Sequence, residues 1–233
     1  MEGHQANLAL FFNPPVDTAT QESYVQEYRP IGQISRGSTL EFNISGSSAD
    51  MVNVHETRLY LKTKIIKKDG SAITIEDPVA FVNLPHQSLF RQVDCFLQQS
   101  QVVSSSTGTY PYRSIFEVLL NYNESAKESH LQSQLFYKDS ASMDETNPVD
   151  GANSGLRFRW QYTKDNGMVE TEGPIFHDIC LQKRLILPGV PISFKFYPSR
   201  DAFCLMSKHK DMYQVEIVEA VRKCAMSKCH RNV

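Results

Sequence analysis

Apolar and polar residues alternate along several short segments of this chain, which is the pattern of a β-strand with one buried face. Leu40, Phe42 and Ile44, for example, are separated by the polar residues Glu41 and Asn43. About eight such strands with long connections are expected, which suits an all-β, antiparallel β-sandwich of jelly-roll type. The residues expected to fill its core are Leu40, Phe42, Ile44, Leu59, Leu61, Val93, Leu97, Phe158, Trp160, Phe194 and Phe196.

Two of the expected strands have less regular patterns. Residues 156–162 alternate large apolar residues with Arg157, Arg159 and Gln161, so they are predicted to form a strand. Near the C-terminus, apolar residues stand at 213, 215 and 217 and then at 218 and 220. This change of phase predicts a β-bulge or burial on both faces.

Turn and loop signals divide the remaining sequence. Asp69-Gly70 predicts a tight turn, because this pair tolerates positive φ, and Ser71–Ile75 is the expected return strand. Lys138–Gly155 is rich in Ser, Asp, Asn and Gly and is expected to be a long loop. Residues 1–37 are expected to form an irregular N-terminal arm, followed by a single jelly-roll domain over residues 38–233.

A helical insertion at about residues 110–136 interrupts the strand pattern. Pro111 suits the first turn of a helix, and Ser125 to Glu128 form a capping-box pattern that predicts a second helix start. Leu131 and Leu135 then share one face. The insertion either closes the domain's own core or packs against a neighbouring subunit. Its apolar stripe, at helical spacing, consists of Tyr112, Ile115, Phe116, Leu119 and Leu120.

Composition limits the classes of function. The 233 residues have a formal net charge of −2, which does not favour a protein that coats nucleic acid. No apolar run reaches the roughly 18 residues that a membrane span needs, and Leu8–Phe12 is too short for the core of a signal peptide. We therefore expect a protein that is made and kept in a reducing compartment and is not secreted. The five scattered cysteines are expected to be buried free thiols.

No group of residues indicates catalysis or cofactor binding. The seven histidines show no metal-binding spacing, and Cys224, Cys229 and His230 lack a second ligand pair. His177 and Asp178 would point to opposite faces if they lay on a strand. There is no Gly-x-Ser-x-Gly elbow and no phosphate-binding loop. We therefore expect no catalytic, cofactor-binding or metal-binding residues, and we predict that the protein is not an enzyme.

Basic residues gather in two places. Arg58, Lys62, Lys64, Lys67 and Lys68 follow one expected strand. They either form a solvated face that discourages unwanted strand pairing, or meet nucleic acid through phosphate charge alone. The second group, near the C-terminus, consists of Lys208, Lys210, Arg222, Lys223, Lys228 and Arg231.

Several motifs in a consistent order resemble the first half of the major capsid protein of Polinton/Maverick elements and adintoviruses. The most specific are Leu119-Leu-Asn-Tyr122, Ala126-Lys-Glu-Ser-His-Leu131 and Ser199-Arg-Asp-Ala-Phe-Cys-Leu-Met206. The resemblance runs from about Leu10 to Val221 and implies a jelly roll of two four-stranded sheets. Proteins of that family carry two jelly rolls in one chain, whereas this chain stops where the first should end.

The resemblance implies a structural capsid protein, located in the virion, that self-associates as a trimer or higher oligomer. Other capsid proteins such as a penton, and weak non-specific contact with nucleic acid, are the further partners it implies. The alternative is a soluble β-sandwich binding module, derived from a domesticated capsid gene. The candidate residues for contacts between subunits are Leu8, Leu10, Phe11, Phe12, Tyr112, Phe116, Leu120 and Leu131.

Overall fold

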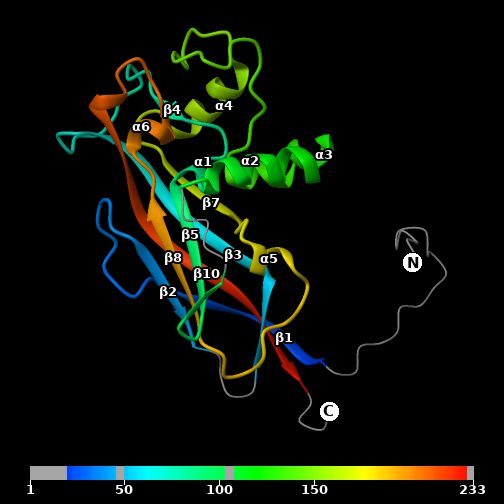
Figure 1. Cartoon of the computed structure of the whole chain (residues 1–233). Coiled ribbons are helices and arrows are strands. Elements are labelled where there is room, and N and C mark those ends of the chain that lie inside the picture. The colour runs from blue at the N-terminus through cyan, green and yellow to red at the C-terminus, as the bar shows by residue number, and fades with distance from the viewer. Residues whose placement is uncertain (1–19, 46–49, 103–107, 230–233) are drawn as a thin grey trace.

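Two four-stranded antiparallel sheets face each other in the computed structural model, which describes residues 20–45, 50–102 and 108–229 (Figure 1). A third sheet consists of two short strands, β4 (Ala80–Phe81) and β9 (Leu205–Met206). The first large sheet has the order β1-β10-β3-β7, formed by β1 (Thr20–Tyr28), β10 (Tyr213–Cys229), β3 (Asp50–Lys67) and β7 (Met168–Pro174). The second has the order β2-β8-β5-β6, formed by β2 (Leu40–Ile44), β8 (Ile192–Pro198), β5 (Phe90–Leu97) and β6 (Ser100–Val102).

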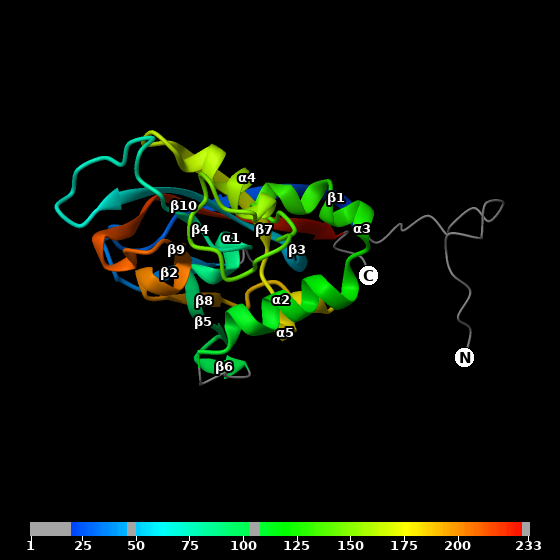
Figure 2. The same ribbon diagram turned by 90° about the horizontal axis from the view of Figure 1, so that it is seen from above.

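Short helices occupy the connections between the strands. In Figure 1 most of them lie toward the upper end of the sandwich, while β1 lies at the lower end. Figure 2 shows α2 and α4 on opposite sides of the short helix α1. The remaining elements are β4 (Ala80–Phe81), α1 (Pro85–Ser88), α2 (Tyr110–Asn121), α3 (Glu124–Lys127), η2 (His130–Gln134), α4 (Ser154–Thr163), α5 (Asp178–Leu181), α6 (Asp201–Cys204), β9 (Leu205–Met206) and η3 (Lys210–Met212).

The core lies between the inner faces of the two large sheets, as the alternation predicted. The ring of Phe196 packs edge-on against Phe42, with centroids 5.7 Å apart, and against Phe90 at 5.0 Å. Leu97, Phe158 and Trp160 were also expected in this core but are not fully buried. The expected core residues that are buried are Leu40, Phe42, Ile44, Leu59, Leu61, Val93, Phe194 and Phe196.

The strand predicted at residues 156–162 is wrong, because this segment forms helix α4. The Asn153 side chain caps the helix by accepting a hydrogen bond from the Leu156 backbone N–H at 3.2 Å. Leu156 and Arg159 face inward at helical spacing, and Phe158 is therefore 48% exposed. A short run of alternating residues is compatible with either structure, and here the cap and the tertiary contacts favour the helix.

The N-terminal arm is not irregular throughout, because Thr20–Tyr28 forms the edge strand β1. This strand pairs with residues 222–229 of β10, and its side chains are mostly exposed. The sequence shows no apolar alternation there because the strand buries little on either face. Ser71–Ile75 also differs from the prediction: the Asp69-Gly70 turn is present, with φ of +86° at Gly70, but only Ala72 bridges back to Ile66.

The predicted change of phase in the last long strand is confirmed. The register between β10 and β3 shifts between Ile217, which lies opposite Thr63, and Glu219, which lies opposite Lys62. Val218 falls in this bulge and is 41% exposed. The bulge therefore changes which side chains of β10 face the core.

Four of the five cysteines are buried free thiols, as expected: Cys95, Cys180, Cys204 and Cys224. Burial raises the pKa of Cys95 to about 12 and that of Cys180 to about 11. These thiols therefore remain protonated near neutral pH and act as small apolar residues.

Candidate assembly interface

Helix α2 is held on the sandwich by one of its faces. Tyr110, Ser114 and Val118, four residues apart, are buried on that face. The Tyr110 hydroxyl donates a hydrogen bond to Oε1 of Gln87, and Nε2 of Gln87 donates to Oε1 of Gln134 at 3.1 Å. This buried polar contact between α1, α2 and η2 fixes the position of the helix, because each of these groups would be costly to leave unpaired.

Four of the five residues of the predicted apolar stripe of α2 face outward, whereas Ile115 is partly buried and packs against the core. Tyr112 is 56% exposed, Phe116 60%, Leu119 52% and Leu120 80%. The insertion does close part of the core, but it does so with the opposite face of the helix. Four large apolar side chains on one exposed helix face form a surface of the kind that a partner protein covers.

Two contacts fix the start of this outer face, which we call the α2 face (Tyr112, Phe116, Leu119 and Leu120). The guanidinium of Arg113 donates to the Asp178 carboxylate at 2.6 Å, which ties α2 to α5. The ring of Tyr112 lies 6.1 Å from that of Phe203, which extends the apolar surface onto α6. The hydrogen bond from Arg113 lowers the pKa of Asp178, so this tie persists to acidic pH.

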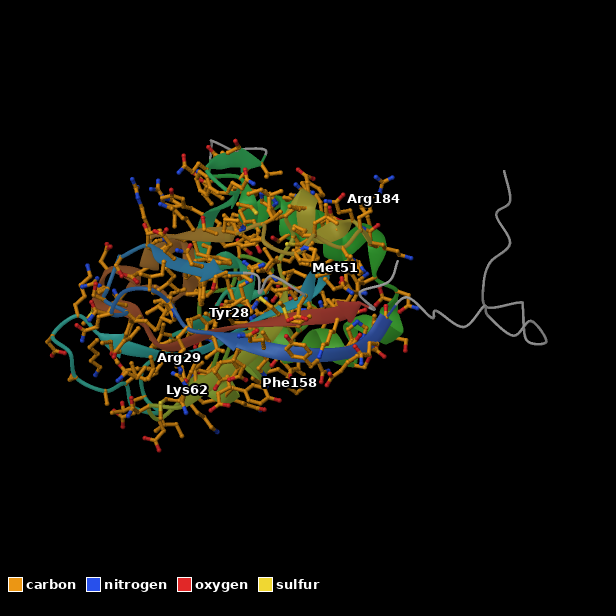
Figure 3. All side chains as sticks on the ribbon, turned by 90° about the horizontal axis from the view of Figure 1, so that it is seen from below. Tyr28, Arg29, Met51, Lys62, Phe158 and Arg184 are labelled. Atoms are coloured by element: carbon orange, nitrogen blue, oxygen red, sulfur yellow. The ribbon has the colours of Figure 1, made fainter. Side chains whose placement is uncertain are left out.

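A second exposed aromatic cluster lies on α4 and the segment before it. The rings of Tyr137 and Phe158 stack with centroids 5.6 Å apart, and the hydroxyls of Tyr137 and Tyr162 are 2.8 Å apart. Phe158 is labelled in Figure 3. The alternation of residues 156–162 does not indicate this cluster, because it predicts a strand for Phe158. The spacing of four residues between Phe158 and Tyr162, following a capping Asn153, is the signal that predicts it.

A buried arginine holds α4 against the rest of the domain. Nε of Arg159 donates to the Phe81 carbonyl at 3.0 Å, and Nη1 donates to the Tyr137 carbonyl at 2.9 Å. Nη2 completes an ion pair with Asp139 at 2.8 Å. Burial lowers the pKa of Arg159, while Asp139 raises it.

The structure places the candidate interface residues in different surroundings. Tyr112, Phe116 and Leu120 lie together on the α2 face, and their role in contacts between subunits stays a prediction. Leu131 was placed among them, but it is 1% exposed and packs within the domain's own core. Leu131 lies on η2, and the spacing of apolar residues in the sequence did not indicate that its side chain faces the core. The four candidates of the arm lie outside the described residues: Leu8, Leu10, Phe11 and Phe12.

Most of the basic residues on β3 are paired with acids on neighbouring elements. Lys62 pairs with Glu170 at 3.0 Å, Lys64 with Glu216 at 3.2 Å, and Lys67 with Asp77 at 3.0 Å. The face therefore offers less free positive charge than the sequence suggested.

Arg222 does not belong to a surface basic group, because it is fully buried. Its guanidinium lies 3.3 Å from the centroid of the Phe194 ring. Every second residue of this part of β10 faces the core, and Arg222 occupies one of those positions beside Cys224.

Residues considered for chemistry serve structural roles where they are described. His177 caps α5 by accepting from the Ile179 backbone N–H at 3.4 Å, and Asp178 pairs with Arg113. Within residues 20–45, 50–102 and 108–229, no three His, Cys, Asp or Glu side chains gather as a metal site. In the same part of the chain, no helix has the length and apolar character needed to cross a membrane.

Comparison with known proteins shows similarity in fold only. No family profile matches the sequence, and no curated protein matches it. A chain in the 3.5 Å cryo-EM structure of the Sputnik virophage aligns over 100% of this chain, with a TM-score of 0.63 and 12% identity. PBCV-1 VP54, from a crystal structure fitted into a reconstruction of Sputnik, aligns over 94% with a TM-score of 0.51 and 9% identity.

These similarities cover only part of the other proteins. The match spans 53% of the Sputnik chain and 45% of VP54, so this chain spans about half their length. The mavirus major capsid protein aligns more weakly, with a TM-score of 0.41 at 10% identity over 96% of this chain and 49% of that one. The chain thus has an all-β sandwich fold, shared with a chain of the Sputnik virophage.

Proposed function

We propose that this chain is a structural subunit of a virus or virus-like capsid that self-associates through the α2 face. Two independent lines support the proposal. The ordered sequence motifs resemble those of Polinton/Maverick and adintovirus capsid proteins. The fold of this whole chain is similar to about half of a Sputnik chain. A structural role agrees with the contacts of His177 and Asp178, which stabilise the fold.

The observation that carries the proposal is the exposure of the α2 face. A helix that only closed its own core would turn its largest apolar residues inward. In α2 the inner face carries Tyr110, Ser114 and Val118, while Phe116 and Leu120 point to solvent. Burial of two such side chains at an interface removes enough apolar area from water to favour association by several kcal/mol, at about 25 cal/mol per Å².

The proposed partners follow from the same role. Copies of this chain, as a trimer or a higher oligomer, are the principal partner, and other capsid proteins such as a penton are further ones. The proposed location is the virion. Contact with nucleic acid is expected to be weak and sensitive to salt, because Lys62, Lys64 and Lys67 are already paired.

The test is a comparison of two double variants by light scattering and negative-stain electron microscopy. Phe116→Glu with Leu120→Glu places two charges on the α2 face and is expected to lower the oligomeric state. Ile31→Glu with Ile75→Glu changes two residues of similar exposure, 59% and 55%, away from α2 and is the matched control. If both pairs leave the oligomer unchanged, or both dissociate it, the α2 face is not the specific contact.

A further inference from the structure

A cavity lies beside the first residues of β10, beyond the part of that strand that pairs with β1. It has a volume of about 730 Å³ and lies between the loop Ile34–Ser38, the segment Pro198–Asp201 and the start of β10 at Gln214–Ile217. Leu40, Ile66 and Leu89 contribute apolar surface to it. We call this cavity the edge groove.

One side of the groove is an open strand edge. β3 pairs with β10 along Tyr213–Lys228, whereas β1 pairs only with residues 222–229. Within the described part of the chain, residues 213–221 therefore have no strand neighbour on the β1 side. Such an edge is a template for an additional strand. The backbone N–H of Val215 is already occupied by the Asp201 carboxylate at 3.0 Å.

Two oxygens among the lining residues lack a hydrogen-bond partner in the described structure. They are Oε1 of Gln214 and Oγ of Ser199. Gln214 is only 6% exposed, so water has little access to its side chain. Buried polar atoms are usually paired, and these two would accept hydrogen bonds from an incoming backbone.

The outer wall of the groove is weakly held. The ion pair between Arg36 and Asp201, at 2.9 Å, ties the loop Ile34–Ser38 to α6, and the Arg36 side chain is 56% exposed. Exposed pairs of this kind contribute little stability. Asp201 thus binds both Arg36 of the loop and the backbone N–H of Val215 in β10. Displacing this one carboxylate would release the loop and would leave the Val215 N–H available to an added strand.

We propose that the edge groove receives residues 8–12 of a second copy of this chain as an added strand. The proposal rests on the proposed capsid function and names one of its contacts. Leu8, Leu10 and Phe12 alternate in the sequence and would share one strand face toward the apolar lining. The segment Asn7–Asn13 has no charged residue, which suits a groove whose rim arginine and aspartate neutralise each other.

The length of the chain favours a second copy as the source. Thr20 pairs with Cys229, at the far end of β10 from the groove. Phe12 stands eight residues before Thr20, a reach of at most about 29 Å. Ile217 lies twelve residues from Cys229 along β10, or about 40 Å. The end of the apolar segment therefore does not reach the groove of its own chain.

Photocrosslinking of the full-length protein tests this contact. Phe12 is replaced by benzoylphenylalanine, and equal amounts of ¹⁵N-labelled and unlabelled protein are mixed before irradiation. Mass spectrometry is expected to find links from residue 12 to residues 34–38 or 214–217 that join labelled with unlabelled copies. The matched control places the same group at Phe158, which is exposed on α4 and is expected to give no link to the groove.

Light scattering on the same samples separates this inference from the proposed function. An oligomer whose residue 12 links elsewhere, or only within one copy, overturns the groove contact and leaves self-association in place. A monomer without links between copies contradicts both.

Discussion

Two fully buried arginines, Arg159 and Arg222, differ in how well the fold satisfies their hydrogen-bond donors. All three side-chain nitrogens of Arg159 donate to an oxygen, including the Asp139 carboxylate. None of the three nitrogens of Arg222 donates to an oxygen in the described structure. Its guanidinium lies over the face of Phe194, with the buried thiols of Cys180 and Cys224 nearby. The sequence does not distinguish them, because both stand in alternating patterns with apolar neighbours.

We therefore expect opposite effects from the same substitution at the two arginines. Arg222→Met removes a buried charge without an acid partner and is expected to leave the free energy of unfolding unchanged or to raise it by roughly 1–4 kcal/mol. Arg159→Met removes the hydrogen bonds to the Phe81 and Tyr137 carbonyls and the ion pair with Asp139, and is expected to lower it by about 1–3 kcal/mol. Urea denaturation measures both, and a larger loss for Arg222→Met would contradict this account.

The buried side chain of His86 makes the free energy of unfolding depend on pH. Burial lowers the pKa of His86 to about 3, and its Nδ1 lies 2.9 Å from Oγ1 of Thr171. The folded state keeps the ring neutral while the unfolded chain takes up a proton below its ordinary pKa of about 6.5. The contribution of the neutral His86 ring to the free energy of unfolding is therefore fully present above pH 6.5. It falls by about 1.4 kcal/mol per pH unit as the pH drops toward 3.

The measurement is the urea midpoint between pH 7 and pH 4.5. His86→Gln is expected to reduce the slope of stability against pH, whereas the control His130→Gln, at an exposed position, keeps the slope of the native protein. Equal slopes in the native protein and His86→Gln would show that other groups dominate the acid response.

At the scale of elements, the sequence predicts strands well where both pattern and packing agree. β2 and β8 follow the alternation of Leu40–Ile44 and Ile192–Phe196, and the bulge in β10 follows from its change of phase. Helix α4 was misassigned because four alternating aromatic and aliphatic residues suit a strand equally well. What separates the two is the local cap by Asn153 and the contacts of Arg159, whose partner Phe81 is distant in the sequence.

The cap of α4 is expected to matter more than a cap on the surface. Asn153 is 2% exposed, accepts from Leu156 N–H and donates to Asp139 at 3.0 Å. Asn153→Ala is expected to lower the free energy of unfolding by about 1–2 kcal/mol. Asn123→Ala, at the exposed cap of α3, is the matched control and is expected to cost less. An equal or larger loss at Asn123, in urea denaturation, would contradict the role given to Asn153.

At the scale of the whole molecule, the sequence predicted the sandwich and the helical insertion but not which face of the insertion is exposed. The stripe from Tyr112 to Leu120 has the spacing of a core-facing helix, and only the position of Tyr110 against Gln87 shows that it faces outward. The pairing of β1 with β10 could not be predicted either, because the edge strand buries few side chains.

Removal of residues 1–19 is expected to leave the fold intact, because every described element begins at or after Thr20. The same deletion removes Leu8–Phe12 and is expected to lower the oligomeric state. Circular dichroism measures the first effect and light scattering the second. Loss of the β-sheet signal on deletion would show that the arm stabilises the domain itself.

The most direct test of the central claim is the mass of the full-length protein in solution, measured by light scattering across a range of concentrations. An assembling capsid subunit is expected to show a mass that is a multiple of one chain and that falls toward one chain in Phe116→Glu with Leu120→Glu. A mass of one chain at every concentration, up to the highest that stays soluble, would contradict self-association through the α2 face.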